Sequence, residues 1–198
     1  MRVSVILSTY NAPDWLEKVL WGYAVQSFRD FEILVADDGS TQETSARIEL
    51  LRRETGLSLR HVWHEHRGFR KCTIVNKAIA LAEADYLLFS DGDCIPRRDF
   101  IQQHVSLSEP GRFLSGGAIR LSMSLSNLID KEAIVAGRFT DPWWLRANGL
   151  RSAKKLLMLW SGPRLARLLD ALTTTRATWN GGNASACLLY TSPSPRDS

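Results

Sequence analysis

Short apolar segments alternate with longer amphipathic segments along the first half of this 198-residue chain, and this alternation constrains the fold most strongly. The apolar segments predict strands at 3–7, 31–36, 57–63 and 86–90, and a further one at 113–121. Helical spacing predicts one helix capped by Asp14 and others at 41–53, 72–84 and 97–106. Strands that alternate with helices of about a dozen residues form βαβ units. The sequence therefore predicts an α/β fold, with a doubly wound, mostly parallel sheet and helices on both faces.

Polar side chains follow three of these strands at the point where each strand ends. These residues are Thr9, Tyr10 and Asn11, then Asp37 and Asp38, and finally Asp91 and Asp93 with Gly92 between them. In a doubly wound sheet the ligand lies beyond the carboxyl ends of the strands. We therefore expect the three groups to converge on one crevice.

The Asp91-Gly92-Asp93 segment has the chemistry of a cation site. Two carboxylates at positions i and i+2 of a strand project to the same side, where they repel each other without a cation. Oxygen ligands suit Mg²⁺ or Mn²⁺, and substrate phosphates often complete the coordination of such ions. The alternative is a surface turn whose aspartates cap a helix.

The Asp37-Asp38 pair has two interpretations as well. One carboxylate can cap the following helix. The other is then free to accept hydrogen bonds from a ligand, such as a base N–H or a sugar hydroxyl, with Thr9 assisting from the neighbouring strand end.

A basic segment lies between the third predicted strand and the next helix. Arg67, Arg70 and Lys71 stand where the loop enters the helix, and a helix N-terminus favours anions. Arg70 is therefore a candidate nucleotide contact, and a solvated basic loop is the alternative. His64 and His66 precede it, but the chain is leaving its strand there, and we expect no metal site from them.

Four segments together resemble the family 2 glycosyltransferases, which have the GT-A fold. They read VSVILSTYN, FEILVADDGST, GFRKCTIVNKAIALAEADYLLFSDGDCIPRRDF and WNGGNASA. The resemblance runs in order from residue 3 to about residue 121 and returns near residue 179. It implies an inverting transfer of a sugar from a nucleotide diphosphate sugar, usually a UDP-sugar, to a glycan or lipid-linked acceptor. It also implies Mn²⁺ or Mg²⁺ and a pathway such as polysaccharide biosynthesis.

The resemblance also implies roles for individual residues. Thr9, Tyr10 and Asn11 resemble the donor-binding loop, and Asp38, with Asp37 beside it, resembles the carboxylate that accepts from the base. Arg70 and Asn76 fall in the nucleotide-contacting segment. Asp91 and Asp93 resemble the D-x-D motif, with Asp91 towards the ribose and Asp93 on the metal. Gly181, Gly182 and Asn183 resemble the segment near the donor sugar and acceptor.

The general base of an inverting displacement is not assigned. In the family this carboxylate follows the Gly-Gly-Asn segment, but here the family pattern ends at Ala186 and is left at Cys187. Asp141 and Asp170, the acids between Glu132 and that point, match no motif. We therefore expect the base to be lost beyond Ala186.

Loss of the base bears on the expected activity. We expect a chain that binds donor and transfers poorly or not at all, which amounts to a nucleotide-sugar-binding module. A haloacid-type phosphatase is a weaker alternative, because Asp91 to Ile95 nearly match its motif while its downstream lysine and acidic pair are missing.

The chain divides into three expected regions. Residues 1–121 form the nucleotide-sugar-binding core, and 122–186 form a partial acceptor-side region, so that the acceptor half is incomplete. Residues 187–198, CLLYTSPSPRDS, resemble a translated sequencing adaptor and are expected to be a non-native tail; a natural disordered tail is the alternative.

Charge and hydropathy bear on partners and location. Residues 138–186 carry eight basic and two acidic side chains, and 141–170 interleave them with Trp and Leu. That pattern fits either an anionic membrane surface or helices packed on the sheet, and it does not favour nucleic acid. Three cysteines and the lack of a long apolar run favour a cytoplasmic protein, and the basic 141–170 region is where it would contact the inner membrane face.

Overall fold

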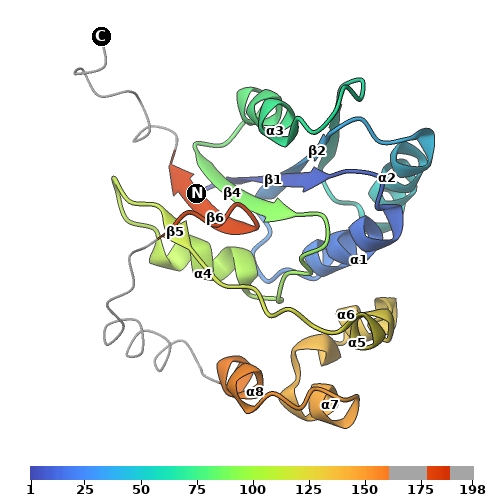
Figure 1. Ribbon diagram of the computed structural model, residues 1–198. Helices are drawn as coiled ribbons and strands as arrows, with labels where there is room; N and C mark the ends of the chain where they lie inside the picture. Colours follow the sequence, from blue (N-terminus) through green and yellow to red (C-terminus); the bar gives the residue numbers. More distant parts are fainter. Residues whose placement is uncertain (161–177, 188–198) are drawn as a thin grey trace. The chain divides into compact units, whose positions relative to one another are not determined.

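The computed structural model describes residues 1–160 and 178–187 (Figure 1). The parts of the predicted basic region at 161–170 and of the predicted tail at 188–198 lie outside the described residues. The chain forms two compact units, Met1–Ala118 with Trp179–Ser198, and Ile119–Thr178. Each unit is described by itself.

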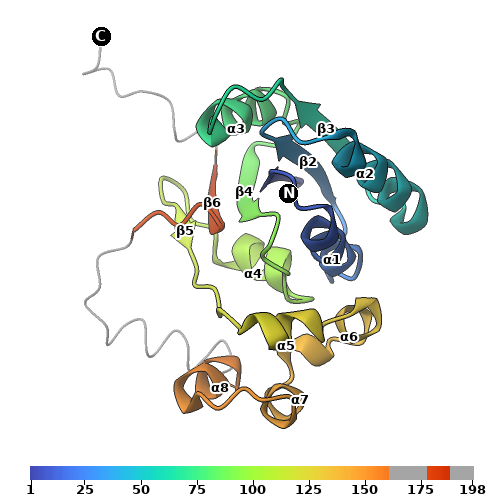
Figure 2. The ribbon, with the colours of Figure 1, turned by 45° about the vertical axis from the view of Figure 1, so that its right-hand side comes forward.

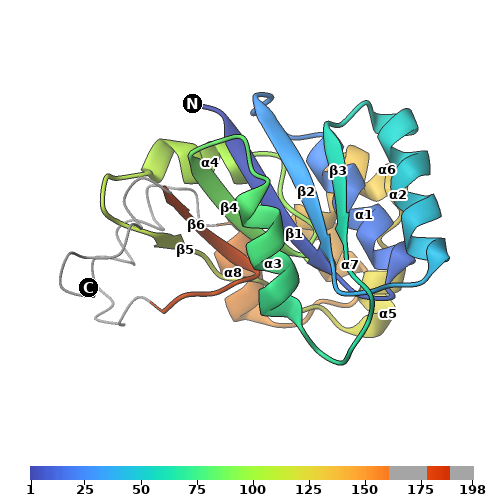
Figure 3. The same cartoon turned by 90° about the horizontal axis from the view of Figure 1, so that it is seen from above.

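The first unit contains a six-stranded sheet in the order β3-β2-β1-β4-β6-β5. The strands are β1 Val3–Thr9, β2 Phe31–Asp37, β3 Leu59–Trp63, β4 Tyr86–Asp91, β5 Leu114–Ser115 and β6 Asn183–Cys187. The first four are mutually parallel, while β6 runs antiparallel to both β4 and β5. Figure 3 shows β1 to β4 side by side.

Helices cover both faces of this sheet (Figures 2 and 3). Alternate β1 side chains point to opposite faces: Val5 and Leu7 pack in the cluster that contains residues of α1 Pro13–Ala24, α2 Gln42–Thr55 and α4 Phe100–Leu107. Ile6 packs in the other cluster, with residues of α3 Lys71–Ala80. Burial on both faces explains the continuous apolar runs of these strands. The predicted α/β class, with a mostly parallel sheet between helices, is confirmed.

Two local predictions were wrong. Helix α1 begins at Pro13, whose fixed φ suits the first helical position, so Asp14 is a first-turn residue that pairs with Arg47 and not the cap. The strand expected at 113–121 is reduced to β5, which is followed by Gly116 and Gly117 and pairs only with two residues of β6.

Strand β6 was not predicted. Its sequence, Asn-Ala-Ser-Ala-Cys, lacks the β-branched and aromatic residues that mark strands. It nevertheless pairs with β4 along its whole length, from Asn183 opposite Ser90 to Cys187 opposite Tyr86. Pairing with a neighbouring strand therefore outweighs the low intrinsic preference of these residues.

The division expected after Ala186 differs from the structure. Ala186 lies inside β6, opposite Leu87 of β4, and the strand continues to Cys187. Cys187, which we assigned to the tail, packs against the core of the sheet. The end of the expected 122–186 region thus belongs to the first unit, because antiparallel pairing with β4 carries it into the sheet.

The second unit consists of short helical segments. They are α5 Met123–Asn127, α6 Lys131–Val135, the 3-10 turn η1 Arg138–Thr140, α7 Pro142–Ala147 and α8 Ala153–Trp160. The side chains of Ser122, Asp130 and Asp141 cap α5, α6 and α7 by accepting from backbone N–H groups. Leu125, Leu145 and Leu150 form a small core. Within the described residues, no helix combines the length and the apolar character needed to cross a membrane.

Candidate functional site

The three predicted groups meet at the carboxyl ends of β1, β2 and β4. Thr9 lies opposite Asp37 in the parallel register, and Ser8 lies opposite Asp91. Backbone hydrogen bonds continue beyond the strands, from Asp38 N to Thr9 O at 3.0 Å and from Gly92 N to Ser8 O at 2.7 Å. The predicted convergence of these strand ends is therefore observed.

Asp37 and Asp38, which we call the β2 pair, are buried and hydrogen-bonded by the chain. Asp37 accepts from Ser40 N and His61 Nε2, both at 2.8 Å. Burial alone would raise the pKa of Asp37, but these hydrogen bonds outweigh it and hold the pKa below its usual value. Asp37 is thus the carboxylate that orders the turn after β2.

Asp38 is held by the segment that leads into α3. One carboxylate oxygen contacts His64 Nε2 at 2.6 Å, and the other accepts from Arg70 N at 2.8 Å. Only 5% of Asp38 is exposed. Each carboxylate oxygen keeps a second lone pair, so the fixed group can still accept from a ligand.

Gly39 allows this segment to lie directly on the turn after β2. Its φ is +90°, and a Cβ there would lie 2.5 Å from the backbone nitrogen of His66. Only glycine fits that approach.

Tyr10 and Asn11 extend the site beyond β1. Asn11 has a φ of +44°, donates from its backbone N to Ser40 Oγ at 2.8 Å and accepts from Thr41 N at 2.9 Å. The Tyr10 ring is half exposed and stacks on His66, with the ring centroids 4.8 Å apart. Asn11 therefore holds the loop in place, whereas Tyr10 offers an accessible ring.

Asp91 and Asp93, which we call the β4 pair, are more open than the β2 pair. Asp91 Oδ1 accepts from Ser8 Oγ at 2.7 Å and from Lys71 Nζ at 2.5 Å. A Cβ on Gly182 would lie 2.7 Å from Asp91 Oδ2, so a larger residue would collide with the carboxylate. Asp93 is exposed.

The β4 pair suits a hard divalent cation. Ligand atoms of Asp91, Asp93 and Cys94 lie within 4.8 Å of one another, the one such group found among the described residues. Burial, and then the neighbouring carboxylates of Asp93 and Asp91, raise the pKa of the Cys94 thiol to about 12. Mg²⁺ and Mn²⁺ prefer oxygen ligands, so the carboxylates of Asp91 and Asp93 are the fitting ligands in this group.

The Gly181-Gly182-Asn183 segment forms the turn that enters β6, beside Asp91. Both ends of the Asn183 amide are used by the chain: Nδ2 donates to Gly117 O and Oδ1 contacts His104 Nε2, each at 2.9 Å. Burial lowers the pKa of His104, although the bond with Asn183 opposes this. The side chain of Asn183 thus has a positioning role, and its contact with substrate stays a prediction.

The rest of β6 carries no carboxylate. Ala184 and Ser185 are buried, and Ser185 Oγ bonds the Tyr86 hydroxyl at 2.6 Å. Ala186 lies next, with a methyl side chain that can neither take up a proton nor bind a ligand through a polar atom. The general base expected beyond Ala186 is therefore not located by this strand, and its position stays a prediction.

Arg70 and Asn76 differ in their relation to the site. Arg70 stands at the N-cap position of α3, gives its backbone N–H to Asp38 and donates from its guanidinium to Glu65 O at 2.8 Å. Asn76 lies farther along α3 and is exposed. Among the described residues, the side chain of Asn76 forms no hydrogen bond with any other predicted site residue.

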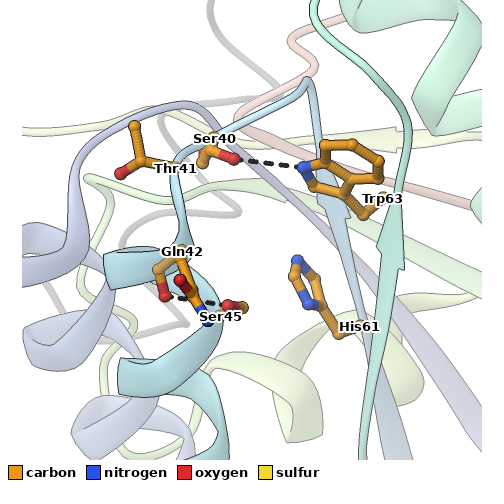
Figure 4. A pocket seen from close by; sticks show the side chains of 6 residues that line it. All are labelled: Ser40, Thr41, Gln42, Ser45, His61 and Trp63. Carbon is orange, nitrogen blue, oxygen red and sulfur yellow. Dashed lines mark hydrogen bonds between the residues drawn. The ribbon is translucent and has the colours of Figure 1, made fainter.

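Several residues that build the site were missed. His61 and His64 come from β3 and the loop after it, and each holds one carboxylate of the β2 pair. Next to them, a pocket of about 390 Å³ is lined by Ser40, Thr41, Gln42, Ser45, His61 and Trp63 (Figure 4). The indole of Trp63 donates to Ser40 O at 3.1 Å. The available sequence signal was the alternation of side chains in β3, which predicts a strand. It does not show which residues of β2 lie opposite those of β3.

The family model described as Glycosyl transferase family 2 matches residues 4–143. The chain belongs to this family. It is 33% identical over 102 residues to validoxylamine A glucosyltransferase of Streptomyces hygroscopicus subsp. jinggangensis, a match that covers 50% of this chain and 24% of the relative. It is 34% identical over 95 residues to poly(ribitol-phosphate) beta-N-acetylglucosaminyltransferase TarS of Staphylococcus aureus, covering 47% and 16%.

A solved structure supports the same fold. The mannosyltransferase PcManGT of Pyrobaculum calidifontis, in complex with GDP-Man and Mn²⁺, matches with a TM-score of 0.51 and 27% identity, covering 56% of this chain and 33% of that one. The matches with the two curated relatives span about a quarter of their length or less. The family and the GT-A-like fold are confirmed; the activity and the substrates are proposals.

Proposed function

We propose that this protein is a metal-assisted, inverting glycosyltransferase that uses a nucleotide diphosphate sugar, in the first place a UDP-sugar. The acceptor would be a glycan or a lipid-linked sugar. The observation that carries the proposal is the convergence of Asp38, Asp91 and Asp93 at adjoining strand ends in a chain of this family.

The proposed nucleotide contacts follow from the hydrogen-bonding capacity that these residues leave unused. Asp38 is held rigidly and keeps lone pairs for a base N–H. Thr9 is 8% exposed, and its Oγ1 has no hydrogen-bond partner among the described residues, so it can bond a ligand. Tyr10 supplies an accessible ring, while Asn11 and Asp37 position the loops. Arg70 and Asn76 remain proposed contacts from α3.

The metal would be held by Asp93, with Asp91 directed to the ribose. Mn²⁺ or Mg²⁺ bound there would neutralise charge on the departing nucleoside diphosphate. PcManGT was solved with GDP-Man and Mn²⁺, which supports a donor and an ion of this kind without deciding the base or the ion for this chain. Gly182 brings its backbone directly against Asp91, where any side chain would collide with the carboxylate, and so leaves that carboxylate free of a side chain.

The general base is unassigned, because no carboxylate of the described residues follows the Gly-Gly-Asn turn. The proposal places it beyond Ala186, where the family pattern has its carboxylate. The second candidate function that we propose is a nucleotide-sugar-binding module, which binds donor and transfers poorly or not at all.

The proposed location is the cytoplasm, with peripheral contact at the inner membrane face. In the described part of 141–170, Trp143 is 76% exposed and Leu157 is 54% exposed, beside the exposed cation Lys154. Apolar and basic side chains in one region are the combination that binds anionic lipid surfaces. Vesicles of anionic lipid should retain the protein at low salt, and failure to retain it would contradict this contact.

Thermal-shift titration tests donor binding. We expect UDP with Mn²⁺ to raise the melting temperature, because a ligand that binds only the folded state stabilises it. GDP and TDP, each with and without Mn²⁺, identify the base and the dependence on metal. A folded protein whose melting temperature responds to none of these nucleotides would contradict the proposal.

A further inference from the structure

Helix α3 begins with an arrangement of charges that is unfavourable for a helix. Helices α1 and α2 carry an acidic residue in the first turn, Asp14 and Glu43. Helix α3 carries none, and instead has Arg70 at the cap and Lys71 at the first position. Cations near a helix N-terminus oppose the helix dipole. Two carboxylates lie against this end of the helix: Asp38 accepts from Arg70 N, and Asp91 pairs with Lys71.

In the structure, part of that negative charge comes from Asp91. The Lys71 ammonium lies 2.5 Å from Asp91 Oδ1. Among the described residues, this is the one salt bridge that either Asp91 or Asp93 makes. The side chains of Lys71 and Asp91 are 37% and 31% exposed. A partly exposed pair of this kind contributes little to stability.

Asp91 does not depend on Lys71 alone. Ser8 Oγ donates to the same oxygen, so Asp91 keeps a hydrogen bond when the ammonium shifts. Lysine has three donors, and Asp91 uses one of them. The ammonium can therefore bond Asp91 and an anion at the same time.

A second observation at these strand ends also indicates a missing ligand. Thr9 is more than nine-tenths buried, and its Oγ1 has no hydrogen-bond partner among the described residues. This hydroxyl borders Gly92, where a Cβ would lie 3.1 Å from it. Buried hydroxyls are normally bonded, so this one is a candidate to bond a polar group of a ligand at these strand ends.

We propose that Lys71 binds the diphosphate of the donor nucleotide, which the ammonium reaches while it stays paired with Asp91. The inference rests on the proposed function, since it places a nucleoside diphosphate at the β4 pair. Lys71 then adds a fixed positive charge to that of the metal, and lysine suits phosphate as a compact point charge. The residue is a binding residue for the leaving group.

Isothermal titration of the 198-residue chain tests this role. The ligands are UDP and UMP, or GDP and GMP if guanine proves to be the base, each in the presence of Mn²⁺. The variant is Lys71→Met, and the matched control is Lys77→Met, an exposed lysine on the same helix. Lys71→Arg retains the charge. Circular dichroism and the melting temperature establish that each variant is folded.

We expect Lys71→Met to weaken diphosphate binding about tenfold or more and monophosphate binding much less, because one charge-assisted hydrogen bond is lost. Lys71→Arg should restore most of the affinity, and Lys77→Met should bind like the wild type. Equal diphosphate affinity in Lys71→Met and wild type would overturn the inference, and so would equal losses for the two ligands. A wild-type protein that binds no nucleotide would instead overturn the proposed function.

Discussion

The β2 pair and the β4 pair stand at neighbouring strand ends but are built in opposite ways. Asp37 and Asp38 are buried, and each is fixed by a histidine and a backbone N–H. Asp91 is partly exposed and pairs with a partly exposed lysine, and Asp93 is exposed. One pair is held by partners within the protein, whereas the other keeps exposed oxygen atoms, which we propose for a cation. The comparison separates a buried half of the proposed site from a more open half.

The largest expected effect lies in stability. Asp37→Ala removes a buried acceptor and leaves Ser40 N and His61 without their partner, which should cost about 2–4 kcal/mol of unfolding free energy. Asp93→Ala should change it by less than about 0.5 kcal/mol, because Asp93 is exposed. Urea denaturation measures both. Similar losses for the two variants would remove the distinction between the pairs.

The contrast between two adjacent glycines sharpens the account of the β4 pair. Gly182→Ala would place a methyl group against Asp91 Oδ2, so nucleotide affinity should fall several-fold, by about 1 kcal/mol. For Gly181→Ala the nearest atom is Trp179 Nε1, at an ordinary 3.9 Å, and binding should be unchanged. Titration with the nucleotide that binds the wild type compares them. Equal affinities would show that the close approach to Asp91 is irrelevant to the ligand.

The smallest expected effect is a dependence of stability on pH. The folded-state pKa of Asp37 is lowered, so its stabilising contribution is complete above the unfolded pKa near 3.9 and is lost as the pH falls through the lower folded value. The stability advantage of wild type over Asp37→Asn should therefore shrink below about pH 4. Urea midpoints between pH 3 and pH 7 measure this. If this advantage does not change with pH, the pH dependence of stability comes from other groups, such as Glu32. The pKa of Glu32 is also lowered, because its hydrogen bonds outweigh the effect of its burial.

How far the sequence could predict this molecule depends on the range of the interactions involved. The strand ends carrying Thr9, Asp38 and Asp91 could be placed together, because parallel strands share one carboxyl edge. Strand β6 could not, because its small residues carry no strand signal and its pairing with β4 comes from tertiary contact. For the same reason a division at Ala186, drawn from the change in composition, falls within a strand. The family was identified from motifs spread over the chain.

The partners of the acidic residues were the part of the site that the sequence could not give. His64 bonds Asp38 and Lys71 bonds Asp91 because β3 and α3 dock on the sheet in one particular register. A periodicity of two indicates a strand but does not fix which residues of the next strand lie opposite it. The sequence predicted a nucleotide contact at Arg70 in the basic loop, which stays a prediction, whereas the structure shows Lys71 paired with Asp91.

The most direct test of the central claim is whether Asp93 binds the metal in the presence of nucleotide. Electron paramagnetic resonance of aqueous Mn²⁺ measures the free ion as protein is added together with UDP, or with the nucleotide that binds the wild type. The variants are Asp93→Asn and, as the matched control, Asp85→Asn, an exposed carboxylate just before the opposite end of the same strand. We predict that wild type and Asp85→Asn remove Mn²⁺ from solution and that Asp93→Asn largely fails to do so. Undiminished Mn²⁺ binding by Asp93→Asn would contradict the account.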